Sequence, residues 1–179
     1  NPSSIHSFGR RTRAVLEVAR KNIANVIGAK SNEIIFTSGG TEANNTVFHT
    51  AVNDLNVSRI ITSQIEHYAV LKPLLKLDKS ICIEYVNVKK NGDINLEHLK
   101  ELLSKKEKTL VSLMHVNNEI GNILPIEEVA SICKDNNAFF HSDTVQSIAY
   151  FDIDVKKLQI DFLSCSAHKF HGPKGIGFL

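Results

Sequence analysis

The sequence has few cysteines, no long apolar run and no signal-peptide pattern. Its three cysteines are odd in number, far apart and set in apolar runs: Cys82, Cys133 and Cys165. This distribution argues against a disulfide framework and is typical of buried thiols in a reducing compartment. No apolar stretch approaches the ~20 residues that a membrane-spanning helix needs. We therefore expect a cytoplasmic protein without a disulfide or a membrane partner.

An excess of charge is also missing. Lysine and arginine number 21 against 19 aspartate and glutamate residues, interspersed without a basic block or an aromatic-rich basic stripe. Nucleic acid is therefore not expected as a partner. With 42% hydrophobic and 22% charged residues, 179 residues can bury one core, which argues against disorder. Because the chain begins at Asn1 without Met and stops inside the apolar run "GIGFL", we expect a piece of a longer protein.

Helical and strand patterns alternate along the chain. Apolar residues recur at helical spacing from Ser7 to Ile27, and Gly28 supplies a stop. Short runs rich in Val, Ile and Phe predict strands, and most intervals between them predict helices. The predicted strands are 33–38, 59–63, 82–88, 109–116, 138–143 and 161–166, and the further predicted helices are 41–52, 67–77, 95–103 and 126–136. This alternation predicts an α/β fold, a mostly parallel sheet with helices on both faces.

Polar segments follow the predicted strands. In open α/β sheets, ligands bind outside the carboxyl ends of the strands. The segments at these positions are Thr37–Thr41, Ser63–His67, Val116–Asn118, Asp143–Gln146 and Ser164–Lys169. The sequence therefore predicts that five separate segments meet along one edge of the sheet.

The stretch "TSGGTEANN" suits a bound phosphate. Its glycines permit close backbone approach, and a helix N-terminus offers free N–H groups and a favourable dipole. It is neither a Walker loop, since no Gly-Lys-Ser/Thr follows, nor a dinucleotide fingerprint, since G-x-G-x-x-G is absent. A glycine turn capped by Thr41 remains the alternative at this point.

Two ionisable residues suggest covalent cofactor chemistry. Lys169 follows a predicted strand, and a lysine in a partly desolvated pocket can form a Schiff base with an aldehyde. Its alternative is an exposed loop lysine. Asp143 follows "AFFHS", where a buried carboxylate would need a cationic partner such as the protonated ring nitrogen of pyridoxal phosphate. Its alternative is a turn or helix-capping aspartate.

Other polar residues at strand ends are weaker signals. His67 could lie against a planar cofactor and exchange protons, or simply begin a helix. Asn118 and Gln146 are uncharged hydrogen-bonding groups. Cys165, His168 and His171 stand at three-residue intervals, but neither C-x-x-C nor H-E-x-x-H is present, so no metal is expected. Hydrolysis by a catalytic serine is disfavoured because G-x-S-x-G is absent.

The ordered segments "SGGTE", "EH", "HVNNEIG", "HSDTVQS" and "SAHKFHGPKGIG" are together more specific than any one of them. They closely resemble the cofactor-binding domain of cysteine desulfurases, pyridoxal-phosphate enzymes of the class V aminotransferase superfamily (fold type I). The resemblance extends over essentially the whole chain, including the opening "NPSSIHSFG".

The resemblance implies a role for each matching residue. Lys169 would form the Schiff base with pyridoxal 5′-phosphate and later move the proton of the substrate α-carbon. Asp143 would pair with the pyridinium nitrogen, and His67 would stack on the ring and act in proton transfer. Gln146 would hydrogen-bond the phenolate oxygen, and Asn118 would approach that oxygen or the substrate carboxylate. The phosphate would be held by the Gly40–Thr41 backbone and by the side chains of Thr41, Ser166 and His168.

The implied reaction removes sulfur from L-cysteine, giving L-alanine and an enzyme persulfide for iron–sulfur cluster or thio-cofactor biosynthesis. The partners would be a sulfur-acceptor or scaffold protein and a second copy of the chain. None of the three cysteines matches the family's catalytic cysteine. Residues 1–179 would thus be the cofactor-binding large domain without the N-terminal segment and the C-terminal small domain, inactive alone. Selenocysteine lyase, a related lyase, or a non-catalytic binding module with the same fold are the alternatives.

Overall fold

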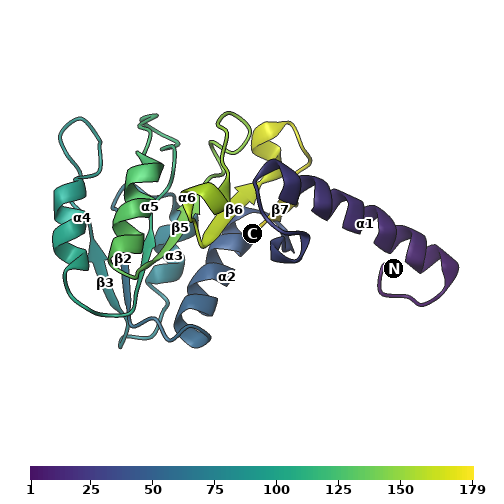
Figure 1. Ribbon diagram of the computed structural model, residues 1–179, viewed down its shortest axis with the longest axis horizontal. Helices are drawn as coiled ribbons and strands as arrows, with labels where there is room; N and C mark the ends of the chain where they lie inside the picture. Colours follow the sequence, from purple (N-terminus) through teal and green to yellow (C-terminus); the bar gives the residue numbers. More distant parts are fainter.

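A seven-stranded sheet with the order β1-β7-β6-β5-β4-β2-β3 organises the computed structural model, which describes residues 1–179 (Figure 1). Strands β2 to β6 pair in parallel, whereas β7 runs antiparallel to both β6 and β1. The mostly parallel α/β sheet predicted from the sequence is therefore confirmed. The strands are β1 (Phe36–Thr37), β2 (Arg59–Thr62), β3 (Cys82–Tyr85), β4 (Thr109–Ser112), β5 (Phe139–Asp143), β6 (Phe162–Ser166) and β7 (Gly177–Phe178).

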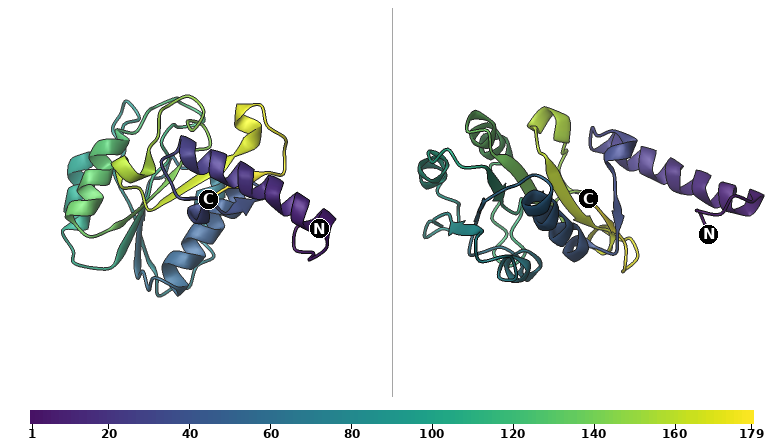
Figure 2. Two further views of the ribbon diagram at one scale, coloured as in Figure 1. Left: turned by 45° about the vertical axis from the view of Figure 1, so that its right-hand side comes forward. Right: turned by 90° about the horizontal axis from the view of Figure 1, so that it is seen from below.

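Helices cover both faces of this sheet (Figure 2). One apolar cluster joins the sheet to α4 and α5, and a second joins it to α2 and α3. Adjacent residues of β4 divide between them, with Leu110 in the second cluster and Val111 in the first, because side chains alternate across a strand. The helices are α1 (Ser7–Val26), α2 (Gly40–Asn53), α3 (Tyr68–Leu74), α4 (Leu96–Leu103), α5 (Ile126–Asp135) and α6 (Val155–Leu158), with 3₁₀ turns η1 (Ser31–Glu33) and η2 (Ala167–Phe170).

Helix α1 forms as predicted, but most of its apolar face is exposed. It projects from the body of the molecule, with the N-terminus at its far end (Figures 1 and 2). Only Gly9 and Ala24 are buried along it, whereas Val15, Val18 and Val26 are exposed. Among all the helices, none combines the length and the apolar character needed to cross a bilayer.

Two local predictions were wrong, and two short elements were missed. The strand expected at 33–38 is reduced to the half-buried pair Phe36–Thr37, because residues 31–33 form the turn η1. Strand β7 and helix α6 were not predicted, since elements of two and four residues are too short to show periodicity. Cys82 is exposed, because it begins the edge strand β3, whereas Cys133 and Cys165 are buried; all three are free thiols.

Candidate active site

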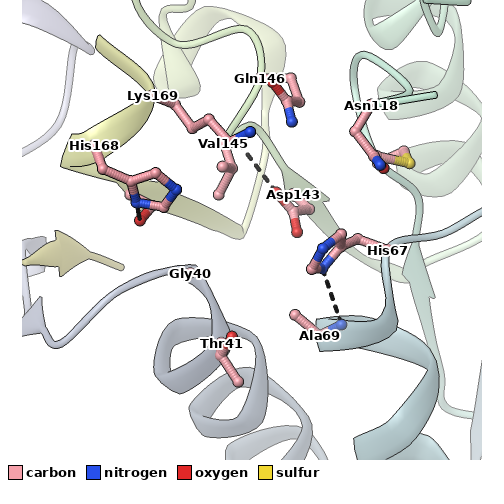
Figure 3. A pocket seen from close by; sticks show the side chains of 12 residues that line it. Gly40, Thr41, His67, Ala69, Asn118, Asp143, Val145, Gln146, His168 and Lys169 are labelled. Carbon is pink, nitrogen blue, oxygen red and sulfur yellow. Dashed lines mark hydrogen bonds between the residues drawn. The ribbon is translucent and has the colours of Figure 1, made fainter. Parts of the chain in front are cut away.

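A cavity of ≈ 140 Å³ lies beside the carboxyl ends of the parallel strands, where the five polar segments come together. Figure 3 shows side chains from these segments turned toward a common space around Asp143. All of the predicted site residues line this cavity. The complete lining is Gly40, Thr41, His67, Ala69, Met114, Asn118, Asp143, Val145, Gln146, Ser166, His168 and Lys169.

Asp143 forms the buried base of the cavity. This last residue of β5 is 5% exposed and accepts hydrogen bonds from Asn44 Nδ2 at 2.9 Å and from the Val145 amide at 3.0 Å. Burial raises the pKa of Asp143, and the two hydrogen bonds and the charge of His67 oppose that rise. No lysine or arginine forms an ion pair with this carboxyl. A cation placed in the cavity would therefore stabilise its ionised form.

Lys169 brings a free amine to the cavity wall. It lies in the 3₁₀ turn η2, directly after β6, and takes part in no salt bridge. The side chain is exposed. The partly desolvated pocket that its sequence position suggested is therefore not formed within these 179 residues, although the residue lines the cavity as predicted.

The glycine pair Gly39-Gly40 lets the backbone at the start of α2 form part of the cavity wall. Gly39 is the N-cap of α2 with φ 151° and ψ −177°, a conformation that is essentially restricted to glycine. A Cβ on Gly40 would lie 2.7 Å from Val145 Cγ2. No side chain caps this helix end, so the alternative of a turn capped by Thr41 was wrong. Thr41 instead is an exposed residue of the first turn, where N–H groups lack helical partners.

Ser166 and His168 complete that side of the cavity. Ser166 is 4% exposed, and its hydroxyl is hydrogen-bonded to His168 Nδ1 at 2.9 Å. Ser166 precedes η2 and lies beside the glycine pair, since a Cβ on Gly39 would be 3.4 Å from Ser166 Oγ, and His168 lines the same cavity (Figure 3). A hydroxyl, an imidazole and free backbone N–H groups form a set that suits an anion.

His67 begins a helix, which confirms one of its two alternatives, and it also lines the cavity. It is the N-cap of α3, and its Nδ1 accepts the Ala69 amide at 3.0 Å (Figure 3). In the neutral imidazole, the proton therefore resides on Nε2, which is left to exchange a proton with a bound group. Gln146 is half-buried and Asn118 is exposed, and both line the cavity opposite the glycine pair.

Three buried side chains near this site were missed by the sequence analysis. Asn44 holds Asp143, while Glu66 and Asn117 join the loops that follow β2 and β4. Asn44 could have been found, because it lies three and four residues after the predicted phosphate-binding positions and so shares their helix face. Glu66 and Asn117 stand in the segments "EH" and "HVNNEIG", but no local pattern predicts their contacts with the backbone of Met114 and Ile65, which are distant in sequence.

A larger groove of ≈ 690 Å³ lies elsewhere, between residues 27–35, α2 and β6. None of its polar lining residues is buried, so it lacks a preorganised polar group. No group of three or more His, Cys, Asp or Glu side chains is arranged to hold a metal ion. The smaller cavity is therefore the candidate active site.

Known proteins resemble this chain along its whole length. The aminotransferase class-V model matches residues 1–179. Cysteine desulfurase IscS of Dictyoglomus turgidum is 50% identical over 182 residues, covering 100% of this chain and 46% of the relative. Putative cysteine desulfurase IscS 1 of Bacillus subtilis is 48% identical, covering 100% and 48%. A mitosomal cysteine desulfurase of Trachipleistophora hominis is 47% identical, covering 100% and 42%.

Solved structures show the same fold. A NifS-like protein superposes with a TM-score of 0.94 at 40% identity, covering 99% of this chain and 50% of the other. SspA in complex with cysteine has a TM-score of 0.94 at 35% identity, covering 99% and 52%. This chain thus spans about half the length of the relatives and structures that it matches. Because the family model matches from the first residue to the last, the chain belongs to the class-V aminotransferase family.

Proposed function

We propose that this chain is the cofactor-binding part of a cysteine desulfurase, which removes sulfur from L-cysteine and releases L-alanine. The observation that carries the proposal is the gathering of Lys169, Asp143 and His67 around one cavity beside the glycine turn. Relatives named cysteine desulfurase match the whole chain, and one solved neighbour is described as a complex with cysteine.

Pyridoxal 5′-phosphate is the cofactor of this family. The residues present fit it on structural grounds. Asp143 is a buried carboxylate without a cationic partner, as the site of a protonated ring nitrogen requires. The glycine pair, Ser166 and His168 supply hydrogen-bond donors for a phosphate, and the unpaired amine of Lys169 suits an aldehyde. When bound, this cofactor withdraws electrons from the substrate α-carbon.

The remaining chemistry follows from the chain's own groups. Lys169 Nζ would hold the cofactor through its aldehyde carbon and would take the proton of the substrate α-carbon. Asp143 would keep the ring nitrogen protonated, and Asn44 keeps that carboxyl oriented. His67 would stack on the ring and exchange protons through Nε2, because Nδ1 is engaged by the Ala69 amide. Gln146 would donate to the ring phenolate oxygen, and Asn118 would approach that oxygen or the substrate carboxylate.

The thiol that accepts the substrate sulfur would lie outside these 179 residues. None of the three cysteines lines the cavity, and Cys133 and Cys165 are buried elsewhere. We therefore propose that residues 1–179 form the large domain, and that the complete protein adds the N-terminal segment, the small domain and the catalytic cysteine. The persulfide formed there would pass to a sulfur-acceptor or scaffold protein, supplying iron–sulfur cluster or thio-cofactor biosynthesis.

The complete protein is further proposed to be a cytoplasmic homodimer. The exposed apolar side chains of α1, among them Val15 and Val18, support association with a second copy, because burying them would be favourable. One of the relatives is described as mitosomal, so cell fractionation is the direct test of location.

Absorbance of the lysine-bound cofactor tests the site. Added pyridoxal phosphate should give a visible band with the wild-type protein, none with Lys169→Ala, and an unchanged band with Lys174→Ala, an exposed lysine of the same segment that does not line the cavity. Equal bands in all three proteins would refute the assignment of Lys169.

Alanine release by the complete protein tests the reaction. L-cysteine should yield alanine and a protein-bound persulfide. Activity toward selenocysteine alone would instead indicate a selenocysteine lyase. Retained cofactor binding without turnover of either substrate would indicate a non-catalytic binding module.

A further inference from the structure

Glu66 is a buried carboxyl that does not line the cavity but contacts Met114 and precedes His67, which do. It is 6% exposed, pairs with no lysine or arginine, and belongs to the turn between β2 and α3. Its Oε1 accepts the Ser63 hydroxyl at 2.7 Å, and its two oxygens share the Met114 amide at 3.2 and 3.0 Å. Burial raises the pKa of Glu66 to about 8, with a smaller contribution from the charge of Asp143.

These hydrogen bonds join two loops that form neighbouring parts of the cavity wall (Figure 3). The turn from Ser63 to Glu66 leads directly into His67, and Met114 begins the loop that carries Asn118. The sequence separation of 48 residues between Glu66 and Met114 shows that the contact is tertiary. The distance between the two loops therefore depends on this carboxyl.

Asn117 makes a second connection between the same loops in the opposite direction. Its Nδ2 donates to the Ile65 carbonyl at 2.7 Å, while its Oδ1 accepts the amides of Glu119 and Ile120 at 2.8 and 3.0 Å. Asn117 is also 6% exposed. Each loop thus contributes one buried side chain to the backbone of the other.

We propose that Glu66 is a positioning residue that, together with Asn117, fixes the His67 turn against the Asn118 loop and so sets the positions of His67 and Asn118 in the cofactor site. The expected effect on cofactor binding rests on the proposed function, whereas the contact between the two loops does not. The contacts need acceptor oxygens rather than a negative charge. A protonated Glu66 can still accept the Met114 amide while it donates its proton to Ser63 Oγ, and a glutamine can make the same pair of hydrogen bonds.

Cofactor affinity in three variants tests this role. Glu66→Leu fills the space but leaves the buried Met114 amide without an acceptor, so the dissociation constant for pyridoxal phosphate should rise about tenfold. Glu66→Gln should remain within about twofold of wild type. Thr109→Val is the matched control, because it removes a buried hydroxyl hydrogen bond to the Glu107 carbonyl at the opposite end of β4. It should leave the affinity unchanged.

A nuclear magnetic resonance signal reports on the contact without cofactor. Met114 is the only methionine of the 179 residues, so ¹⁵N-methionine labelling marks the amide that Glu66 accepts. Its peak, identified by its loss in Met114→Leu, should shift in Glu66→Leu and stay near its wild-type position in Glu66→Gln and Thr109→Val. A wild-type protein that binds no pyridoxal phosphate would refute the proposed function. The position of the Met114 peak would still show whether Glu66 contacts the Met114 amide.

Two results would overturn the positioning role. If Glu66→Gln weakens cofactor binding as much as Glu66→Leu, the charge of Glu66 matters and its hydrogen-bond geometry does not. An unmoved Met114 peak in Glu66→Leu would show that the carboxyl does not hold this loop. Should Glu66→Leu fail to fold, the Glu66→Gln comparison alone still decides the first point.

Discussion

Asn44 of α2 donates a hydrogen bond of 2.9 Å to Asp143 of β5, in the buried base of the cavity and across 99 residues of sequence. Asn44 is fully buried. This contact orients the carboxyl that we assign to the ring nitrogen of the cofactor, and it partly offsets the rise in the pKa of Asp143 that burial causes.

Removing this contact should destabilise the protein. Asn44→Ala leaves a buried carboxylate oxygen without its partner, so the free energy of unfolding in urea should fall by about 1–3 kcal/mol. The neighbouring Asn45→Ala, at a partly exposed position where the side chain bonds only the Thr41 carbonyl, should change it by less than about 0.5 kcal/mol. Similar losses of unfolding free energy in both variants would show that the hydrogen bond from Asn44 to Asp143 does not contribute more than an exposed one.

Gly39→Ala should weaken cofactor binding. Because Gly39 has φ 151° and ψ −177°, an alanine there would strain the backbone by about 1–3 kcal/mol and move the turn that precedes α2. The dissociation constant for pyridoxal phosphate should rise about tenfold or more. Gly121→Ala is the control: Gly121 has φ 73° but does not line the cavity, so this variant should strain the backbone without changing the dissociation constant. Equal affinity in wild type and Gly39→Ala would contradict the assigned phosphate site.

His141 should make stability depend on pH in mildly acidic solution. It is fully buried between the hydroxyls of Ser112 and Ser164, at 2.8 and 2.9 Å, and burial lowers its pKa from 6.5 to about 3. Between these pH values, the unfolded chain binds a proton that the folded chain does not. The contribution of His141 to the free energy of unfolding is therefore complete above pH 6.5 and falls as the pH drops toward 3, whereas the raised pKa of Glu66 acts in the opposite direction.

The slope is about 1.4 kcal/mol per pH unit, which gives about 2 kcal/mol between pH 6.5 and pH 5. Urea unfolding of wild type and His141→Gln over this range measures the difference. His49→Gln, on the exposed side of α2, controls for the removal of one histidine. An identical pH dependence in wild type and His141→Gln would rule out the buried neutral histidine.

Thiol reactivity should separate the cysteines. Burial raises the pKa of Cys133 and of Cys165 to about 12, so neither thiol should react in the folded protein at neutral pH, whereas Cys82 is exposed. A chromogenic disulfide reagent should label one thiol in the native chain and the other two only after unfolding. Cys82→Ser should abolish the native signal. Rapid labelling of three thiols under native conditions would contradict the buried positions.

The sequence by itself determined the fold class and the residues that line the site. Helix α2 begins at Gly40, one residue before the predicted start, and the polar segments after β2, β4, β5 and β6 meet at one edge. Periodicity, turn residues and strand ends are local features, because each depends on residues that are close in sequence. Parallel pairing then brings the carboxyl ends of the strands together. Only the ordered set of motifs made Lys169 a stronger candidate than any exposed lysine.

The tertiary structure decided which side chains are buried and what they contact. Cys82 is exposed because β3 became an edge strand, and most of the apolar face of α1 finds no partner within the chain. Glu66 reaches Met114 and Asn44 reaches Asp143 across 48 and 99 residues. Burial and long-range hydrogen bonds depend on how strands order in the sheet, and no local pattern encodes that order. For this reason, the sequence identified the residues around the cavity, whereas the structure identified the residues that hold them in place.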